Sequence, residues 1–217
     1  MAEFTIYIGN KNYSSWSLRG WLMLKHTGAT FDEVIIPLSE PSTRATILRH
    51  SPSGKVPALQ HGDHLVWDSL AIGEYLAELY PPARLWPEEM KARSVARAVS
   101  AEMHAGFAPL RTHLPMNMRS SFPDRGVTPE AQADINRITA LWRDCRSRFG
   151  VGGEFLFGHF TIADAMYAPV VSRFRTYKIA LEEEAQRYAD AIWALPALQE
   201  WLAAARNEPM IIEAAEF

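Results

Sequence analysis

The sequence of 217 residues contains a single cysteine, Cys145. One cysteine cannot form an intramolecular disulfide, and it excludes both a thiolate zinc cluster and a redox-active Cys-x-x-Cys pair. The chain is therefore not expected to depend on disulfides for its stability or to exchange them as its chemistry, and no bound metal is implied.

The sequence also lacks a large excess of one charge. It has 22 Lys and Arg residues and 25 Asp and Glu residues, which give a net charge of −3. Such a balance gives no electrostatic footprint for nucleic acid or for an anionic membrane. The most apolar window spans residues 155–171. It is interrupted by Gly158, His159, Asp164 and Pro169, so it is not a membrane span. The N-terminus has no signal-peptide pattern, and we expect a soluble cytoplasmic protein.

The first 28 residues predict a strand followed by a helix. Apolar residues 4–8 indicate a buried strand, and helical spacing after Ser17 ends at Gly28, a typical glycine after a helix. Ser14 and Ser15 lie where the strand meets the helix N-terminus, where free backbone N–H groups and the helix dipole attract anions. A plain helix cap formed by either serine is the alternative interpretation.

The next 55 residues predict the rest of a small α/β unit. The expected elements are a short buried strand at 31–37, a short helix at 42–50, a strand at 55–60, a turn at 61–63, a strand at 64–67 and a helix from Asp68 to Pro81. This βαβαββα order is the thioredoxin-like arrangement. The Val56-Pro57 segment falls where that fold places its cis-proline.

After Pro87 the pattern is helical to the end of the chain. Helices are expected at 91–114, at 129–149, from Thr161 through Val171 and at 195–206. Thr161 and Asp164 have the spacing of a capping box. We therefore predict a thioredoxin-like α/β N-terminal domain, residues 1–82, followed by an all-α C-terminal domain, residues 88–217.

Three segments resemble the glutathione transferases. Val56-Pro57 before a strand and Asp68-Ser69 at the start of a helix look like the glutathione-binding features of that family. The run Ser14-Ser15-Trp16-Ser17-Leu18-Arg19 is similar to the Ser-Ser-Cys-x-x-Arg signature of the zeta class, the maleylacetoacetate isomerases. Trp16 stands where that class has cysteine. The resemblance extends over essentially the whole chain.

The resemblance assigns the reacting end of glutathione to the serine segment. A cysteine-like thiol has a pKa of about 8.5, so little of it is nucleophilic thiolate at neutral pH. The resemblance implies that the Ser14 hydroxyl donates a hydrogen bond to the thiolate, with Ser15 as the alternative donor. The helix N-terminus favours the same ionised sulfur.

Further positions would hold the rest of glutathione. The resemblance implies that its peptide backbone pairs with Val56, presented by a cis bond before Pro57. The Ser69 hydroxyl and N–H would bind the γ-glutamyl carboxylate, with Asp68 near the ammonium group. Lys55 would reach a carboxylate. From the residues alone, Asp68 and Ser69 also fit a plain helix cap, and Lys55 fits a solvated loop lysine.

The helical half would complete the site. In zeta-like enzymes a histidine follows an acidic residue near glutathione, and here the match is His104 after Glu102. The alternative is a histidine satisfied at an interface. An apolar pocket for the second substrate would be lined by Trp16, Met103 and Phe107.

An arginine holds the substrate carboxylate in the zeta isomerases. Its matching position in this chain is Thr176, one residue beyond Arg175. Arg175 or Arg111 is therefore the candidate, and solvent-facing arginines are the alternative.

The resemblance predicts a homodimeric glutathione transferase whose partners are glutathione and a small electrophile. Conjugation is placed first, because Trp16 and the shifted arginine both favour the less demanding reaction. Glutathione-dependent cis–trans isomerisation, as in a maleylacetoacetate isomerase, is second. A non-catalytic binding protein of the same fold is the alternative from another class. The sequence leaves the electrophile and the pathway open.

Overall fold

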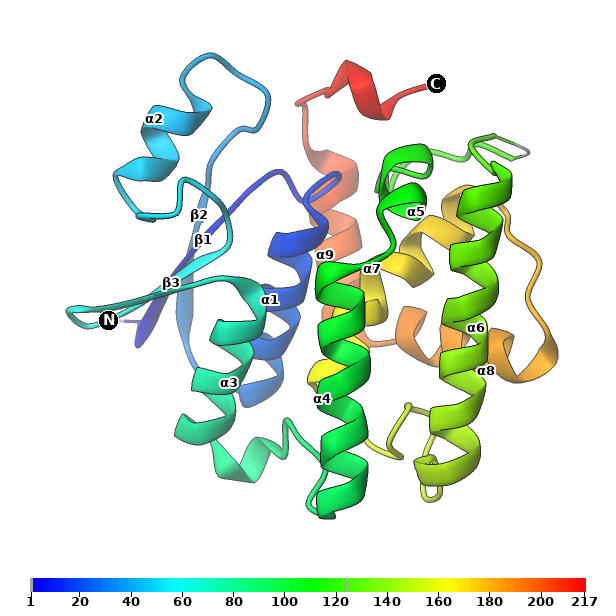
Figure 1. The fold of residues 1–217 in the computed structure, drawn as a ribbon. Coiled ribbons are helices and arrows are strands. Elements are labelled where there is room, and N and C mark those ends of the chain that lie inside the picture. Colours follow the sequence, from blue (N-terminus) through cyan, green and yellow to red (C-terminus); the bar gives the residue numbers. More distant parts are fainter. Residues whose placement is uncertain (1, 124) are drawn as a thin grey trace.

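The computed structural model describes residues 2–123 and 125–217. Its first part follows the predicted βαβαββα order (Figure 1). The elements are β1 (Phe4–Ile8), α1 (Ser15–Thr27), β2 (Phe31–Ile35), α2 (Thr43–Leu48), β3 (Ala58–His61), β4 (His64–Trp67) and α3 (Ser69–Leu79). The strands lie in the order β2-β1-β3-β4, with β1 parallel to β2 and antiparallel to β3.

The second part is helical. It comprises the 3-10 turn η1 (Pro81–Ala83), α4 (Met90–Ala105), α5 (Ala108–His113), α6 (Pro129–Phe149), α7 (Ile162–Thr176), α8 (Glu183–Trp193), α9 (Pro196–Asn207) and the 3-10 turn η2 (Glu213–Ala215). The two parts together confirm the predicted fold class. No helix in residues 2–123 and 125–217 is both long and apolar enough to cross a membrane.

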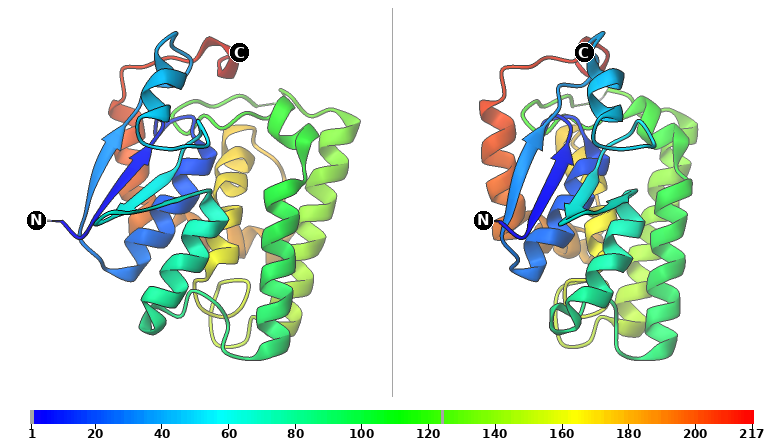
Figure 2. Two further views of the ribbon diagram at one scale, coloured as in Figure 1. Left: turned by 60° about the vertical axis from the view of Figure 1, so that its left-hand side comes forward. Right: turned by 90° about the vertical axis from the view of Figure 1, so that its left-hand side faces the viewer.

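Helix α1 joins the two parts of the molecule. It packs beside α3, and it also contacts α7 and α9 of the helical part (Figure 2). Beneath it, Phe4, Ile6 and Ile8 of β1 are each at most 1% exposed, as the alternation of a half-buried strand requires. The helix ends at Gly28 in the left-handed conformation, φ 77°, which confirms the predicted stop.

Helix α7 forms the centre of the helical part, and nearly every one of its side chains is buried. The predicted capping box is present at its start. The fully buried Asp164 carboxylate accepts hydrogen bonds from the Thr161 N–H at 2.8 Å, the Thr161 hydroxyl at 2.9 Å and the Leu156 N–H at 3.1 Å. Burial nevertheless raises the pKa of Asp164 to about 6, because desolvation outweighs these hydrogen bonds.

Two predictions about elements were wrong. The strand expected to be buried, β2, lies at the edge of the sheet, and its Val34 and Ile35 side chains are 36% and 40% exposed. The single helix expected at 91–114 is divided into α4 and α5. Phe107 adopts φ 60° at the break. Gly106 before it and Pro109 after it both oppose a continuous helix.

Candidate active site

A cavity of about 620 Å³, here called the main cavity, lies where α1, α3 and α4 meet the loop before β3. Eight residues predicted from the sequence line it: Ser14, Trp16, Lys55, Val56, Pro57, Asp68, Ser69 and His104. The Val56–Pro57 peptide bond is cis. Residues separated by up to 90 positions in the sequence are thus brought to one cavity.

Ser14 caps α1 and is held by a third serine of the same segment. Its hydroxyl donates a hydrogen bond to the Ser17 oxygen at 2.7 Å and accepts a long one from the Ser17 N–H at 3.4 Å. The cap interpretation is therefore correct for Ser14, and the same side chain also faces the main cavity. Ser15 points elsewhere, because it lines a neighbouring chamber and not the main cavity.

Asp68 and Ser69 form the start of α3. One oxygen of the Asp68 carboxylate accepts the N–H groups of Leu70 and Ala71, at 2.8 and 3.3 Å. The other oxygen lies 3.3 Å from Nε2 of His104 on α4. Asp68 is thus a cap, as the alternative interpretation stated, and it also links the two parts of the molecule.

Two polar atoms at this cavity are buried without a partner. Neither the Ser69 hydroxyl oxygen nor Nδ1 of His104 makes a hydrogen bond within the described residues. Buried polar atoms are normally paired, and the cost of leaving one unpaired is about 1–3 kcal/mol. Both residues line the main cavity, although the two atoms themselves are closed off from solvent in this structure.

A second chamber of about 370 Å³, here called the side chamber, adjoins the main cavity. Trp16 and Leu38 line both spaces and separate them. Its other lining residues are Tyr13, Ser15, Ser39, Arg111, Pro115, Met116, Arg173, Ile212, Ala214 and Ala215. The side chamber is therefore built from the serine loop (residues 10–14), the start of α1, α5, α7 and the C-terminal segment (residues 208–217).

Three arginines are gathered around this chamber. Arg19 is fully buried beneath Trp16, with its Cζ atom 4.5 Å from the indole centroid, and Arg111 lies 4.8 Å from the same centroid. Arg173 is 4% exposed and donates to the backbone oxygens of Leu114 and Pro169.

The hydrogen-bond acceptors of these arginines are backbone carbonyls rather than carboxylates within the described chain. Both terminal nitrogens of Arg19 and Nη1 of Arg111 have no partner there. Burial, reinforced by repulsion from Arg111, lowers the pKa of Arg19 and lowers that of Arg173 to about 9. Positive charge without acidic partners makes the chamber suited to an anion.

The C-terminal segment covers the side chamber. Ile212, Ala214 and Ala215 form part of its wall. The segment is attached to the serine loop by the Tyr13 hydroxyl, which donates to Glu216 at 2.6 Å, so that burial and this acceptor raise the pKa of Tyr13. Arg119 strengthens the attachment by donating to the Tyr13 oxygen at 2.7 Å.

Three predicted pocket residues lie away from both spaces. Met103 and Phe107 are packed in the hydrophobic core, 0% and 8% exposed, and neither lines a cavity described here. Arg175 forms an ion pair with Asp190 at 2.6 Å and covers the ring of Trp193 on α8. Helix α8 packs against α7 on the side that carries Arg175, which explains why this arginine points away from both cavities.

Sequence reasoning did not single out Ser17, Arg19 or Arg173 as functional. Ser17 had a usable signal, because it lies one helical turn after Ser14 and therefore on the same face. Arg19 was part of the quoted motif. Arg173 lies two residues before Arg175, in the region where the resemblance implies a substrate-binding arginine, but its sequence neighbours do not show that its side chain is buried.

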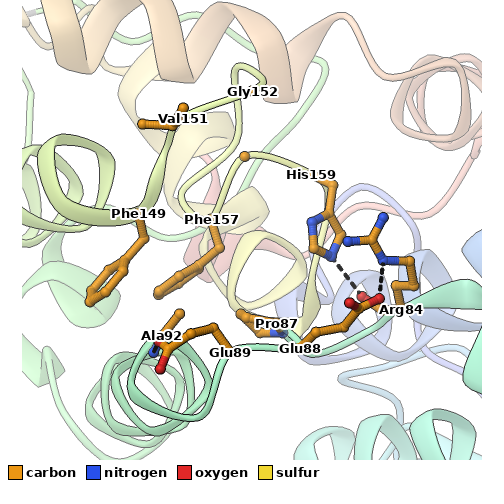
Figure 3. A pocket seen from close by; sticks show the side chains of 11 residues that line it. Arg84, Pro87, Glu88, Glu89, Ala92, Phe149, Val151, Gly152, Phe157 and His159 are labelled. Atoms are coloured by element: carbon orange, nitrogen blue, oxygen red, sulfur yellow. Dashed lines mark hydrogen bonds and ion pairs between the residues drawn. The ribbon is translucent and has the colours of Figure 1, made fainter.

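A third hollow, of about 480 Å³, lies between the start of α4 and the loop after α6 (Figure 3). Its polar groups already have partners: Arg84 pairs with Glu88 at 3.0 Å, His159 Nε2 lies 3.0 Å from the Arg84 carbonyl, and Glu89 caps α4. None of the predicted site residues lines it. The predicted site residues that line a cavity lie instead at the main cavity and the side chamber.

Comparison with known proteins matches both parts of the chain to family descriptions. Residues 13–79 match the glutathione S-transferase N-terminal domain, and residues 94–204 match the C-terminal domain. A maleylacetoacetate isomerase from Rattus norvegicus is 27% identical over 183 residues, 81% of this chain and 80% of the relative. A glutathione S-transferase from Triticum aestivum is 26% identical, covering 90% of this chain and 91% of the relative.

Solved structures show the same fold. A glutathione transferase homologue from Burkholderia, crystallised with bound glutathione, superposes with a TM-score of 0.71 at 24% identity and covers 94% of this chain and 97% of that one. A theta class glutathione S-transferase from Xanthomonas axonopodis, also with glutathione bound, has a TM-score of 0.67 at 21% identity, covering 93% and 98%.

Proposed function

The chain is an enzyme of the glutathione S-transferase family, and on that premise we propose that it conjugates glutathione to small electrophiles through a thiolate stabilised by Ser14. The observation that carries the proposal is the gathering of Ser14, Val56, Pro57 and Ser69 around one cavity. In this proposal residues 1–82 bind glutathione, and residues 88–217 complete the site for the electrophile. The protein would act as a cytoplasmic homodimer, without nucleic acid or membrane partners.

The proposed orientation of glutathione follows from the unpartnered atoms. The Ser69 hydroxyl and the start of α3 receive the γ-glutamyl carboxylate, because a helix N-terminus favours an anion. His104 lines the same cavity, and its unpartnered Nδ1 would take a second polar group after a small turn of the ring. Val56 offers its backbone to the peptide, and Lys55 offers a positive charge at the cavity rim. Asp68 lies near the ammonium group while sharing its charge with His104.

The proposed reaction requires a thiolate in this cavity. The Ser14 hydroxyl donates to the sulfur, and the nearby N-terminus of α1 adds its dipole. A pKa lowered by two units corresponds to about 2.7 kcal/mol of preferential stabilisation of the thiolate, which is within the range of such contacts. The thiolate then attacks the electrophilic carbon, a carbon–sulfur bond forms, and the leaving group departs.

Glutathione-dependent isomerisation is the second candidate, and the arginines of the side chamber favour it. Arg111 and Arg173 would hold a substrate carboxylate while the thiolate adds to a conjugated cis double bond, the bond rotates and the thiolate leaves. Conjugation remains first, because it needs only the thiolate and a neighbouring pocket, and because Trp16 replaces the cysteine of the zeta signature.

Glutathione supplied in catalytic amounts separates the two reactions. With a cis-dienoic acid as substrate, many turnovers per glutathione, lost in Arg111→Leu and retained in Arg175→Leu, would place isomerisation first. Arg175 is the matched control because it is paired with Asp190 outside both cavities. Stoichiometric consumption of glutathione by an aryl halide, without isomerisation, supports conjugation.

Binding without chemistry is the outcome that opposes both candidates. Retention on immobilised glutathione, followed by a screen of electrophiles, tests it directly. A protein that is retained but consumes and isomerises nothing across aryl halides, epoxides and unsaturated acids would be a binding protein of this fold.

A further inference from the structure

Ser17 lies behind Ser14 and is completely buried, with an exposed fraction of 0%. Its hydroxyl oxygen receives two hydrogen bonds, one from the Ser14 hydroxyl at 2.7 Å and one from the Gly9 N–H at 2.9 Å. Gly9 directly follows β1, so Ser17 connects the end of the sheet to the residue that faces the main cavity.

The Ser14 hydroxyl has only one proton, and in this structure that proton is donated to Ser17. Stabilising a thiolate requires the same proton to point at the sulfur. The two serine oxygens, 2.7 Å apart, would then have no proton between them, and their lone pairs would repel each other. A proton donated by Ser17 to Ser14 removes this repulsion. Ser17 has such a proton, and the described residues give it no other acceptor.

We propose that Ser17 is a positioning residue that donates its own hydroxyl proton to Ser14 when Ser14 donates to the glutathione sulfur. The hydrogen bond between the two serines reverses its direction and both O–H bonds are kept. The Ser17 side chain turns slightly to aim its proton at Ser14, because the present geometry suits Ser14 as the donor. The inference rests on the proposed role of Ser14 as the thiolate donor. Ser15 does not share the role, because it faces the side chamber.

The reversed arrangement forms a chain in a single direction. The Gly9 N–H donates to Ser17, Ser17 donates to Ser14, and Ser14 donates to the sulfur. Each hydrogen bond in such a chain polarises the next one, and burial of Ser17 shields the chain from water. Ser17 therefore makes Ser14 a stronger hydrogen-bond donor. This effect stabilises the ionised sulfur and leaves the binding of the rest of glutathione unchanged.

Two measurements separate this role from a structural one. The first is the pKa of the thiol of bound glutathione, obtained from the ultraviolet absorbance of the thiolate. The second is the affinity for S-methylglutathione, which has no ionisable thiol, obtained by calorimetry. We expect Ser17→Ala to raise the pKa of the bound thiol by about half a unit to one unit. The affinity for S-methylglutathione should stay within about twofold, because that ligand makes every contact except the thiolate.

Conservative variants keep the test decisive if Ser17→Ala folds poorly. Ser17→Thr retains the hydroxyl and should return the pKa of the bound thiol towards the wild-type value. Ser17→Val has the same shape as Ser17→Thr but lacks the hydroxyl, and it should leave the pKa raised. Ser100→Ala is the matched control, because Ser100 is also fully buried and lies outside both cavities. It should leave the pKa of the bound thiol unchanged.

The outcomes distinguish the inference from the function on which it rests. If Ser14→Ala raises the pKa of the bound thiol and Ser17→Ala does not, the inference fails and the role of Ser14 stands. Equal weakening of S-methylglutathione and glutathione by Ser17→Ala would assign Ser17 a purely structural role. No effect of either substitution on the pKa would remove the serine mechanism itself.

Discussion

Ser69, at the start of α3, is central to the proposed glutathione site. Its side chain is 1% exposed, and its hydroxyl lacks a partner within the described residues although it lies at the wall of the main cavity. A bound carboxylate would satisfy this hydroxyl and the adjacent backbone N–H groups together. A serine that only shaped the helix would not require a ligand.

We predict that Ser69→Ala weakens glutathione binding by about 1.5–3 kcal/mol, the usual contribution of a hydrogen bond to a charged group. Titration calorimetry measures the loss. Ser100→Ala removes an equally buried and unpartnered hydroxyl away from the cavity, and it should leave the affinity unchanged. An unaltered affinity in Ser69→Ala would reduce Ser69 to a helix residue.

Individual site residues were predictable to the extent that a motif fixes them. Val56, Pro57 and Ser69 were predicted from the resemblance of their segments to glutathione transferase motifs, and all three line the main cavity. Arg175 was misplaced, because its direction depends on the packing of the next helix, α8, whose Asp190 pairs with it. Side-chain direction on a core helix is a tertiary property that local sequence does not encode.

At the level of elements, the start of α7 is held by several buried hydrogen bonds to one carboxylate, that of Asp164. Asp164 accepts three hydrogen bonds while fully buried, and it connects the loop that ends at Thr161 to the helix. Its burial opposes ionisation, so this capping element is sensitive to pH.

We predict that Asp164→Ala lowers the free energy of unfolding by about 2 kcal/mol or more, because it removes the cap and leaves buried N–H groups unpaired. Urea denaturation measures the loss. As a comparison, Ser94→Ala on the exposed side of α4 should change the stability by less than about 0.5 kcal/mol.

The pH dependence of this element has a definite sign. The pKa of Asp164 is about 6 in the folded protein, above the ordinary value of about 3.9 expected after unfolding. The stabilisation from the protonated form is therefore complete below pH of about 4 and is lost as the pH rises through about 6. The stability difference between the wild type and Asp164→Asn should fall over this interval. A difference that grows with pH would contradict it.

Elements with strong local signals were predicted correctly, including the β3–β4 hairpin, α3 and α6. The division of α4 from α5 was not predicted, because the apolar spacing typical of one helix continues across Gly106 and Pro109. The exposure of β2 could not be predicted from its apolar residues, because strand order decides which strand lies at the edge.

Across the whole molecule, Arg119 ties three segments together. It donates to the Tyr13 hydroxyl of the serine loop and to the Glu208 carbonyl of the C-terminal segment, and it lies 3.5 Å from Glu216. Its side chain is 22% exposed, so these contacts are partly shielded from water. The wall of the side chamber depends on this attachment.

We predict that Arg119→Leu lowers the free energy of unfolding by about 1.5–3 kcal/mol. It should also raise the KM for the electrophile more than the Kd for glutathione, because the C-terminal segment lines the side chamber and not the main cavity. Arg143→Leu, which breaks an exposed pair with Glu182, should cost less than about 1 kcal/mol. Equal effects of Arg119→Leu on both substrates would contradict the assignment of the two spaces.

The most direct test of the account is the pKa of the thiol of bound glutathione in the wild type and in Ser14→Ala. The protein adds no thiolate signal of its own, because its single cysteine is buried and its pKa is raised to about 12. We predict a wild-type value about two units below the ordinary 8.5, and in Ser14→Ala a pKa at least about one unit higher with turnover reduced tenfold or more. An unchanged pKa and unchanged turnover in Ser14→Ala would contradict the account, because Ser14, unlike Ser15 and Tyr13, lines the main cavity.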